Sequence, residues 1–383
     1  MSQTPSPILP PAMLGILGGG QLGRMFTIAA KTMGYKVTVL DPDPQAPAAA
    51  FADRHLCAPF NDADALAIMS ECAAVTTEFE NVNAQAMIDL ATHTRVSPSG
   101  ECVAIAQNRI LEKKWIRQAG LATAPYAVIE TSAALTQSFS AYLPGIMKTA
   151  TMGYDGKGQI RVSTPAEVAA AFAELGNVAC ILERMLPLKS EVSAIVARLN
   201  DQQISCFAPA ENQHKDGILD VCIVPARLPE TLQTQAQNMA KRLANELDYV
   251  GVLAVEFFVL EDQTLIVNEM APRPHNSGHY TLTACLADQF QQQVRTLCGL
   301  NPAKPDLLTP CVMVNLLGNE WPSTGGEPNW APLQQSSNAH LYLYGKEAAR
   351  PGRKMGHYTV LGQDTEALLA QALALQNTLT QPL

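Results

Sequence analysis

Residues 252–279 read VLAVEFFVLEDQTLIVNEMAPRPHNSGH, and the pattern of this stretch indicates a β-hairpin followed by a polar loop. Two apolar runs, Val252–Leu260 and Thr264–Met270, are separated by a very short polar connection. Runs of this length and composition predict two antiparallel strands, with Asp262-Gln263 as a two-residue hairpin loop. Counting back from that loop places Glu261 opposite Thr264 and Glu256 opposite Glu269.

The opposed acids Glu256 and Glu269 point to a metal ion. Like charges on opposed strand positions destabilise a sheet unless something offsets them, and apolar neighbours limit the access of water to Glu256. A bridging Mg²⁺ resolves this conflict, because hard cations bind carboxylate oxygens and nucleotide phosphates together. Asn268 supplies a neutral oxygen or an NH₂ donor beside them. Two alternatives stay open: a register slip that separates the acids, or one acid kept protonated.

The segment after the second strand, residues 271–279, carries chemistry-bearing side chains. Its two prolines make it stiff and non-helical. Arg273, His275 and Asn276 therefore lie just beyond the carboxylates, in a loop position that catalytic groups often occupy. A solvated loop with a chance cluster of polar residues is the alternative.

A glycine-rich turn opens the chain's first folding unit. Met13–Leu17 predicts a strand, Gly18–Gly23 the turn, Met25–Met33 a helix and Lys36–Leu40 a second strand, which together form a βαβ unit of a parallel sheet. The turn matches G-x-G-x-x-G, and Asp41 follows where a ribose-binding acid would lie. A dinucleotide site, an anion site for another ligand and simple tight-turn packing all remain possible.

A second glycine-rich segment runs from Lys148 to Gln159. Its three glycines, with a lysine between them, suit a mobile flap over phosphates, and Lys148 lies on the strand leading into it. The segment is not a Walker A sequence. Because Tyr154-Asp155-Gly156 is also good turn chemistry, an ordinary hairpin is the alternative.

Hydrophobic periodicity predicts most of the remaining elements. Helices are expected over Ile105–Ala119 and Thr231–Leu247. Further strands are expected at Ala73–Thr77, Arg95–Ser97, Val178–Leu182, Glu191–Ala197 and Leu341–Tyr344. Glu183 and Glu191 border two of these strands, where a carboxylate either contacts adenine or ribose or pairs with a surface lysine. The segment Glu211–His214 is equally ambiguous.

Composition limits the choice of ligand. With 383 residues the chain is expected to form two or three domains, and 26 Lys and Arg against 35 Asp and Glu give a net charge of −9. This balance argues against a binder of nucleic-acid polymers. Four of the 26 cations nevertheless fall within Lys346–Lys354, and the Pro351-Gly352 pair makes this segment a turn. Converging Arg and Lys side chains suit a phosphomonoester, with a solubility patch as the alternative.

The cellular setting also follows from the sequence. The nine cysteines show no Cys-x-x-Cys spacing, which favours free thiols in a reducing compartment over disulfides or zinc. The charge-free N-terminal 23 residues lack a basic region and contain several prolines, so they do not predict an export signal. No apolar run is long enough to span a bilayer. We therefore expect a soluble, cytoplasmic protein with no membrane partner.

Seven stretches in this order resemble the ATP-grasp superfamily, and within it the 5-(carboxyamino)imidazole ribonucleotide synthase family of purine biosynthesis. The stretches are ILGGGQLGRM (16–25), TTEFENV (76–82), GYDGKGQ (153–159), SEVSAIVAR (190–198), ENQHKDGIL (211–219), NEMAPRPHNSGH (268–279) and RPGRKMGH (350–357). The resemblance implies an α/β and α+β architecture. It comprises a Rossmann-like N-terminal domain (1–107), an ATP-grasp domain of two lobes (108–309) and a small C-terminal substrate-binding region (310–383).

The resemblance also implies a reaction. ATP and Mg²⁺ convert bicarbonate to carboxyphosphate, which breaks down to carbon dioxide and phosphate. The amine of 5-aminoimidazole ribonucleotide captures the carbon dioxide, giving 5-carboxyaminoimidazole ribonucleotide, ADP and phosphate. Members of the family are commonly homodimers, so the expected partners are these small molecules and a second copy of the chain.

Individual roles follow from the same resemblance. Glu256 and Glu269 are implied as metal ligands. Arg273 is implied to stabilise carboxyphosphate, while Tyr154, Asp155 and His275 hold the imidazole and its amine, which Asp155 orients or deprotonates. Contacts to ATP are implied for Arg109, Lys148, Gly153, Tyr154, Asp155, Gly156, Lys157, Gly158, Gln159, Glu183, Arg184, Met185, Leu186, Glu191, His214, Asn268 and Glu269. Contacts to the ribonucleotide are implied for Gln21, Tyr154, Asp155, Arg273, His275, Asn276, Lys346, Arg353 and Lys354.

Other functions compete with this one. Within the superfamily they are the formate-dependent glycinamide ribonucleotide transformylase and biotin carboxylase, against which the NSGH and RPGRKMGH segments argue. A dinucleotide-dependent dehydrogenase built on the Gly18–Gly23 turn would leave the paired acids and the second glycine loop without a role. A non-catalytic nucleotide-binding regulator would not need the full set of acids, flap and arginine loop.

Overall fold

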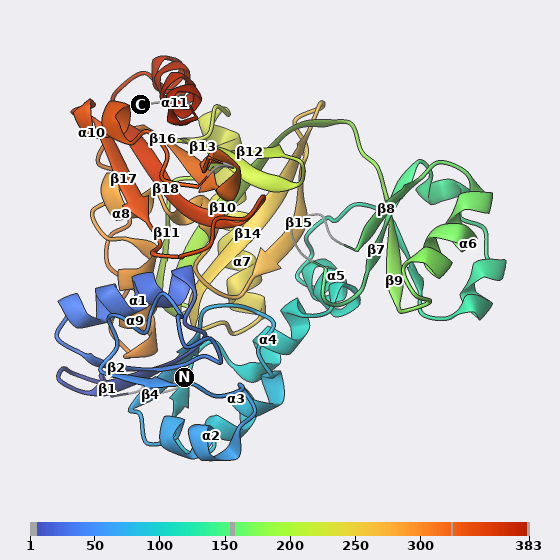
Figure 1. The fold of residues 1–383 in the computed structure, drawn as a ribbon. Helices are drawn as coiled ribbons and strands as arrows, with labels where there is room; N and C mark the ends of the chain where they lie inside the picture. Colours follow the sequence, from blue (N-terminus) through green and yellow to red (C-terminus); the bar gives the residue numbers. More distant parts are fainter. Residues whose placement is uncertain (1–5, 154–157, 323–324, 381–383) are drawn as a thin grey trace.

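The computed structural model describes residues 6–153, 158–322 and 325–380, and its strands form three sheets (Figure 1). The first is a five-stranded parallel sheet in the order β3-β2-β1-β4-β5. Its strand order confirms the Rossmann-like N-terminal domain. The elements are β1 (Met13–Leu17), α1 (Gln21–Thr32), β2 (Lys36–Leu40), β3 (Arg54–Leu56), α2 (Ala63–Met69), β4 (Ala74–Thr77), α3 (Ala84–Leu90), β5 (Arg95–Val96) and α4 (Gly100–Ala106).

The helix predicted over Ile105–Ala119 is wrong as a single element. It is divided into the end of α4 and a separate α5 (Arg109–Gln118). Asn108 breaks the helix because its backbone is extended and its side chain accepts hydrogen bonds from the backbone N–H groups of Ile110 and Leu111. A capping asparagine satisfies the free donors of a new helix, which the apolar periodicity alone does not reveal.

The second sheet is a small antiparallel lobe that stands apart from the rest of the molecule in Figure 1. Its order is β6-β9-β7-β8, and the buried side chains of Ile129, Met147, Phe172 and Leu182 form its core. Its elements are β6 (Tyr126–Ile129), two 3₁₀ turns (Ser132–Thr136 and Ser140–Tyr142), β7 (Gly145–Thr149), β8 (Gln159–Val162), α6 (Pro165–Glu174) and β9 (Cys180–Arg184).

The third sheet has nine strands and runs in the order β15-β14-β10-β12-β13-β16-β18-β17, with β11 paired to β10. Because β13 pairs with β16, strands after residue 310 extend the sheet that carries Glu256 and Glu269. The predicted boundary at residue 309 therefore lies between strands of one sheet. The strands are β10 (Leu188–Asn200), β11 (Gln203–Cys206), β12 (Ala210–Lys215), β13 (Ile218–Val224), β14 (Gly251–Leu260), β15 (Leu265–Ala271), β16 (Cys311–Leu317), β17 (Ala339–Leu343) and β18 (Lys354–Leu361).

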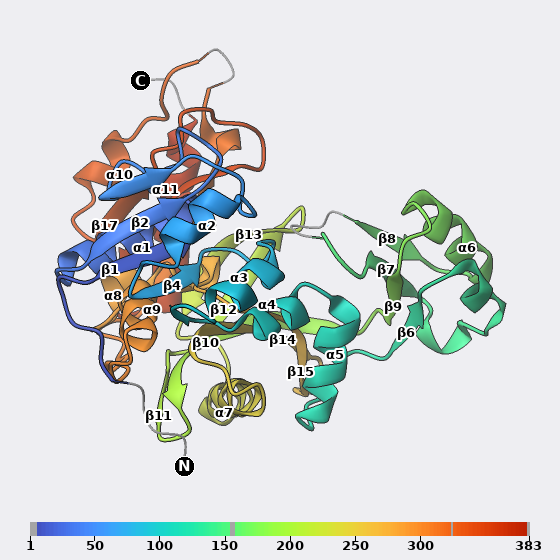
Figure 2. The ribbon, with the colours of Figure 1, turned by 90° about the horizontal axis from the view of Figure 1, so that it is seen from below.

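Helices cover this large sheet and join it to the N-terminal domain. The helix α7 packs on β10 and β14, while α9 packs against α1 of the Rossmann-like domain (Figure 2). Met25 and Phe26 of α1 share one buried apolar cluster with Phe290 and Val294 of α9. The two domains therefore have a common core. The helical elements after residue 200 are α7 (Glu230–Glu246), a 3₁₀ turn (Asn276–Gly278), α8 (Thr281–Ala284), α9 (Gln289–Leu297), a 3₁₀ turn (Gly318–Glu320), α10 (Ala331–Gln335) and α11 (Thr365–Leu379).

The hairpin of β14 and β15 confirms the paired acids but not the predicted loop. The Leu260 N–H donates to the Thr264 carbonyl at 2.9 Å, so three residues form the loop, and Gln263 adopts a φ of 68°. If the pairing continued unchanged from that loop, the two acids would be offset by one residue and would not lie opposite each other. A bulge on β15 at Asn268 corrects the register, so that Glu256 lies opposite Glu269. The predicted pairing of Glu261 with Thr264 is thus wrong.

Candidate active site

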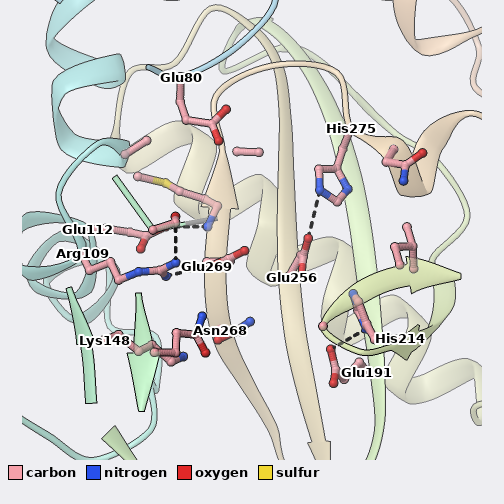
Figure 3. A pocket seen from close by; sticks show the side chains of 18 of the residues that line it. Glu80, Arg109, Glu112, Lys148, Glu191, His214, Glu256, Asn268, Glu269 and His275 are labelled. Carbon is pink, nitrogen blue, oxygen red and sulfur yellow. Dashed lines mark hydrogen bonds and ion pairs between the residues drawn. The ribbon is translucent and has the colours of Figure 1, made fainter. Parts of the chain in front are cut away.

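A cavity of about 850 Å³ lies where the three sheets meet. The N-terminal domain contributes Gln21 to its wall, and the small lobe contributes Lys148. The large sheet contributes the acids Glu256 and Glu269, and the C-terminal turn contributes Lys346. Residues from all three predicted domains therefore share one wall, part of which is drawn in Figure 3.

A different basic side chain pairs with each of the two opposed acids. The Glu256 carboxylate lies 3.0 Å from His275 Nε2, and the Glu269 carboxylate lies 2.8 Å from Arg109 Nη1 (Figure 3). Burial alone would raise the pKa of Glu256, but the hydrogen bond and charge of His275 outweigh it and lower that pKa to about 2. Glu256 is therefore ionised. The observed register also excludes the alternative of a slip that separates the two acids.

Glu112 is a buried acid that sequence reasoning missed. It lies on α5 one turn after Arg109, is 2% exposed, and accepts a hydrogen bond from the Met270 N–H at 2.6 Å. Burial, and next the negative charge of Glu269, raise the pKa of Glu112 to about 7. The signal in the sequence was its i+3 spacing from Arg109, which puts both side chains on one helix face. Glu112 thus fixes α5 to the strand that carries Glu269.

The Glu183 carboxylate is held by two lysines. Lys113 Nζ and Lys148 Nζ each lie 2.5 Å from one of its oxygens. Burial would raise the pKa of Glu183, but the charges of Lys148 and Lys113 lower it to about 2. Its predicted partners, adenine or ribose, stay untested. The structure also brings in Lys113, which the sequence did not single out among the charged residues of α5.

On the opposite wall, Glu191 and His214 form a pair across β10 and β12. His214 Nδ1 lies 3.1 Å from the Glu191 carboxylate (Figure 3). Burial disfavours the charged imidazole, yet the hydrogen bond and charge of Glu191 raise the pKa of His214 overall. Both residues line the cavity, as do Arg184, the last residue of β9, and the following Met185 and Leu186. The structure therefore brings these predicted ATP contacts together.

The loop after β15 also faces the cavity. The Arg273 guanidinium pairs with Glu80. Glu80 belongs to the segment TTEFENV, but no role was predicted for it from the sequence. His275 Nδ1 lies 2.8 Å from the Ser277 hydroxyl, so both ring nitrogens of His275 are engaged. Asn276 is 6% exposed, and its two amide atoms have no hydrogen-bond partner among the described residues. An unpartnered buried amide in a cavity wall suits a polar ligand.

In the first glycine turn, carboxylates of the chain itself accept the hydrogen bonds of the backbone N–H groups. The N–H groups of Gly20 and Gly23 each donate to the Glu78 carboxylate at 2.6 Å, and the Gly19 N–H donates to Asp41 at 2.6 Å. Gly18 has a φ of 100°, a backbone conformation that favours glycine. Because these donors are already used, the dinucleotide interpretation of this turn is wrong, and Asp41 is a turn partner rather than a ribose ligand.

The basic C-terminal turn is divided between the cavity and the surface. Lys346 Nζ donates to Gln21 Oε1 at 2.6 Å and to the Lys354 carbonyl at 2.7 Å, and all three residues line the cavity. Arg353 instead donates to the Ala348 carbonyl at 2.7 Å and is not among the described lining residues. Burial first, and then the charges of Arg353 and Lys354, lower the pKa of Lys346 to about 8.

The flap is described only at its edges. Gly153 and Gln159 line the cavity, and Gly158 has a φ of 70°. Four predicted residues, Tyr154, Asp155, Gly156 and Lys157, lie outside the described residues. No helix in the described part of the chain is long and apolar enough to cross a membrane.

Three family models match successive parts of the chain. The ribonucleotide synthetase preATP-grasp domain matches residues 12–107, and the ATP-grasp domain matches residues 114–290. The phosphoribosylaminoimidazole carboxylase C-terminal domain matches residues 311–371. These matches follow the order of the three parts expected from the sequence.

Whole-chain comparisons agree. The chain is 45% identical over 358 residues to N5-carboxyaminoimidazole ribonucleotide synthase of Bacillus subtilis, with 93% of each chain covered. A crystal structure of the ADP complex of an N5-carboxyaminoimidazole ribonucleotide synthetase superposes with a TM-score of 0.90 at 40% identity, covering 98% of this chain and 99% of the other. The N5-carboxyaminoimidazole synthase of Aspergillus clavatus, in complex with ADP and 5-aminoimidazole ribonucleotide, has a TM-score of 0.87 at 28% identity, covering 96% and 98%.

The Rossmann-like domain, the small lobe that lines a cavity with paired acids, and the matches over nearly the full length lead to one assignment. The chain belongs to the N5-carboxyaminoimidazole ribonucleotide synthase family of ATP-grasp ligases.

Proposed function

We propose that the chain carboxylates 5-aminoimidazole ribonucleotide with bicarbonate and ATP, forming 5-carboxyaminoimidazole ribonucleotide, ADP and phosphate in purine biosynthesis. One observation carries this proposal: a single cavity is lined both by the paired acids with Lys148 and by the basic turn with Lys346. A nucleotide triphosphate and a ribonucleotide phosphate can therefore bind in different parts of it, and Arg273 also lines its wall. The relatives that bind ADP and 5-aminoimidazole ribonucleotide support the same pair of ligands.

The acids also suit Mg²⁺. Glu256 and Glu269 are opposed on neighbouring strands, and the buried Asn268 Oδ1 beside them has no hydrogen-bond partner among the described residues. Two carboxylates and an amide oxygen form the hard, all-oxygen donor set that Mg²⁺ prefers when it also binds phosphates. Bound there, Mg²⁺ would neutralise charge on the ATP phosphates. Glu256 and Glu269 would hold it, while Arg109 and His275 keep both acids oriented.

Phosphoryl transfer to bicarbonate depends on positioning and charge rather than on covalent chemistry by the protein. Lys148 and Arg109 would bind the ATP phosphates, and Glu191 with His214 would contact the nucleoside side. Arg273, held by Glu80, would stabilise the negative charge of carboxyphosphate. The flap of residues 153–159 would exclude water, because carboxyphosphate that meets water is lost to hydrolysis.

The second half of the reaction takes place at the ribonucleotide end. Carboxyphosphate releases carbon dioxide and phosphate, and the exocyclic amine attacks carbon dioxide to form the carbamate. Asn276 and His275 would hold the imidazole, with Tyr154 and Asp155 of the flap completing the site. Asp155 would orient the amine or accept its proton. Lys346, Lys354 and Gln21 would bind the ribonucleotide phosphate.

The test follows ADP release while bicarbonate, formate and each candidate amine are varied. We expect ADP release to require 5-aminoimidazole ribonucleotide and bicarbonate together. Glu269→Gln should abolish ADP release and leave the circular dichroism spectrum unchanged, whereas the matched control Glu261→Gln, at the exposed hairpin tip, should retain full activity. A requirement for formate or biotin would contradict the substrate assignment, and near-normal turnover by Glu269→Gln would contradict the metal assignment.

We also propose a cytoplasmic homodimer. All nine cysteines are free thiols, which supports a reducing compartment. Light scattering of the purified chain should give twice the mass of 41.1 kDa. A monomeric mass at micromolar concentration would contradict the dimer.

A further inference from the structure

A buried cluster of three charges lies behind the phosphate end of the cavity. Lys113 of α5, Glu183 of β9 and Lys148 of β7 are 1%, 3% and 7% exposed. Each lysine nitrogen lies 2.5 Å from a different oxygen of the Glu183 carboxylate. Because the cluster contains two cations and one anion, it retains one net positive charge.

The two lysines differ in their access to a ligand. Lys148 lines the cavity, whereas Lys113 is not among its described lining residues. Lys113 Nζ instead donates to the Asn268 carbonyl at 2.7 Å, on the strand that carries Glu269. Lys113 therefore contacts both the small lobe, through Glu183, and the large sheet, through Asn268, from a position behind the cavity wall.

We propose that Lys113 is a positioning residue for the ATP phosphates, because it balances Glu183 and so leaves the charge of Lys148 available to the ligand. The inference rests on the proposed ATP-dependent function. Without Lys113, Glu183 would pair with Lys148 one to one, and the cluster would lose its net charge. In a buried site, where water screens little, such a loss acts strongly on a neighbouring anion.

The same geometry gives Glu183 a role other than a direct ligand contact. Both of its carboxylate oxygens are directed to lysines. Removing the Glu183 charge should therefore not weaken phosphate binding, since Lys148 would then keep its charge without a counterion. If the Glu183 carboxylate instead accepted hydrogen bonds from adenine or ribose, removing its charge would weaken nucleotide binding.

The test measures ADP binding by calorimetry for the full chain and four variants. Lys113→Met should weaken ADP binding on the order of tenfold. The control Lys114→Met changes the exposed neighbour on the same helix and should leave affinity unchanged. Glu183→Gln should bind ADP at least as tightly as the unaltered chain. The double variant Lys113→Met/Glu183→Gln should regain most of the lost affinity, because Lys148 is again unbalanced.

Steady-state kinetics adds a second measurement. Lys113→Met should raise the KM for ATP and leave the KM for 5-aminoimidazole ribonucleotide unchanged, since Lys346 and Gln21, which are proposed to bind the ribonucleotide phosphate, are not part of the cluster. Circular dichroism verifies the fold of each variant. If Lys113→Met does not fold, Glu183→Gln alone still decides between the two roles of Glu183.

Three outcomes would overturn the inference. They are unchanged ADP affinity in Lys113→Met, weakened affinity in Glu183→Gln, and a folded double variant that binds no better than Lys113→Met. The last result would show that Lys113 serves only the packing of the lobe. Failure of the unaltered chain to bind ADP would be a different result, because it would contradict the proposed function itself.

Discussion

At the scale of the residue, the basic turn shows that charge alone does not make a ligand contact. Lys346 is directed to Gln21 in the part of the cavity that we propose binds the ribonucleotide, whereas Arg353 donates to a backbone carbonyl of its own turn. The turn sequence predicted equal roles for these cations. Their different orientations depend on how residues 346–354 fold back on β18, which a turn motif does not encode.

Lys346→Ala should therefore raise the KM for 5-aminoimidazole ribonucleotide by about tenfold or more, while Arg353→Ala should change it much less. A phosphate anchor that lies far from the reacting atoms contributes mainly binding energy. Initial rates at saturating ATP and bicarbonate provide the comparison. A larger effect from Arg353→Ala would assign the phosphate to the outer side of the turn.

The pKa of Lys346 predicts a dependence on pH. Burial and neighbouring cations lower this pKa to about 8, so Lys346 carries its charge below that pH and loses it above. The phosphate requires the charged form, so kcat/KM for the ribonucleotide should fall as pH rises through about 8. Lys346→Arg keeps its charge at all these pH values and should lack this alkaline decline. A pH profile that is identical in both proteins would exclude Lys346 as its cause.

At the scale of the element, the β14–β15 hairpin shows how far a register can be predicted. The alternation of apolar residues placed the two strands correctly, and the opposition of Glu256 and Glu269 is confirmed. The loop was wrong because Gln263 adopts a left-handed conformation that its residue type does not announce. The bulge at Asn268 could not be predicted from the sequence either, since no local propensity identifies an asparagine as the extra residue of a strand.

The first glycine turn gives a prediction about stability. Glu78→Ala should lower the free energy of unfolding by about 2 kcal/mol or more, because the buried N–H groups of Gly20 and Gly23 would lose their acceptor. Urea unfolding followed by fluorescence measures this change. Asp43→Ala, at an exposed position after the same sheet edge, is the control and should change stability little. Equal stability of the two variants would show that water replaces the Glu78 carboxylate at no cost.

At the scale of the whole molecule, the sequence predicted the three consecutive parts but not how they join. β1 and β2 were predicted to the residue, since an alternation of strand, glycine turn and helix is a local signal. The pairing of β13 with β16 joins strands that are almost 90 residues apart, and the α1–α9 core joins residues that are more than 250 apart. Contacts of such long range leave no periodicity in a single sequence.

Part of the candidate site was not predicted for the same reason, because its residues contact partners that are far away in the sequence. Residues on quoted motifs, such as Glu256, Glu269 and His275, were found because one short segment carries them. Glu112 and Lys113 were missed, because their importance depends on the position of α5 against β9 and β15. Glu80 was missed because its partner, Arg273, lies 193 residues later.

The shared core predicts that the N-terminal domain and the large sheet unfold together. Phe290→Ala, which empties a fully buried position facing α1, should cost about 3–5 kcal/mol and lower the melting temperature of both domains as one transition. Differential scanning calorimetry tests this expectation. Leu308→Ala, at a position that is 63% exposed, serves as the control. Two separate transitions, of which only one moves, would show that the domains are energetically independent.

Glu78 has a consequence for any nucleotide that approaches the first glycine turn. A tethered group competes at an effective concentration of about a millimolar or more, and here the competitor is already seated with its hydrogen bonds formed. A free phosphate would have to displace it and leave a buried carboxylate without partners. The backbone N–H groups of this turn are therefore closed to a phosphate, so a ligand at this end of the cavity would be held by side chains such as Gln21 and Lys346.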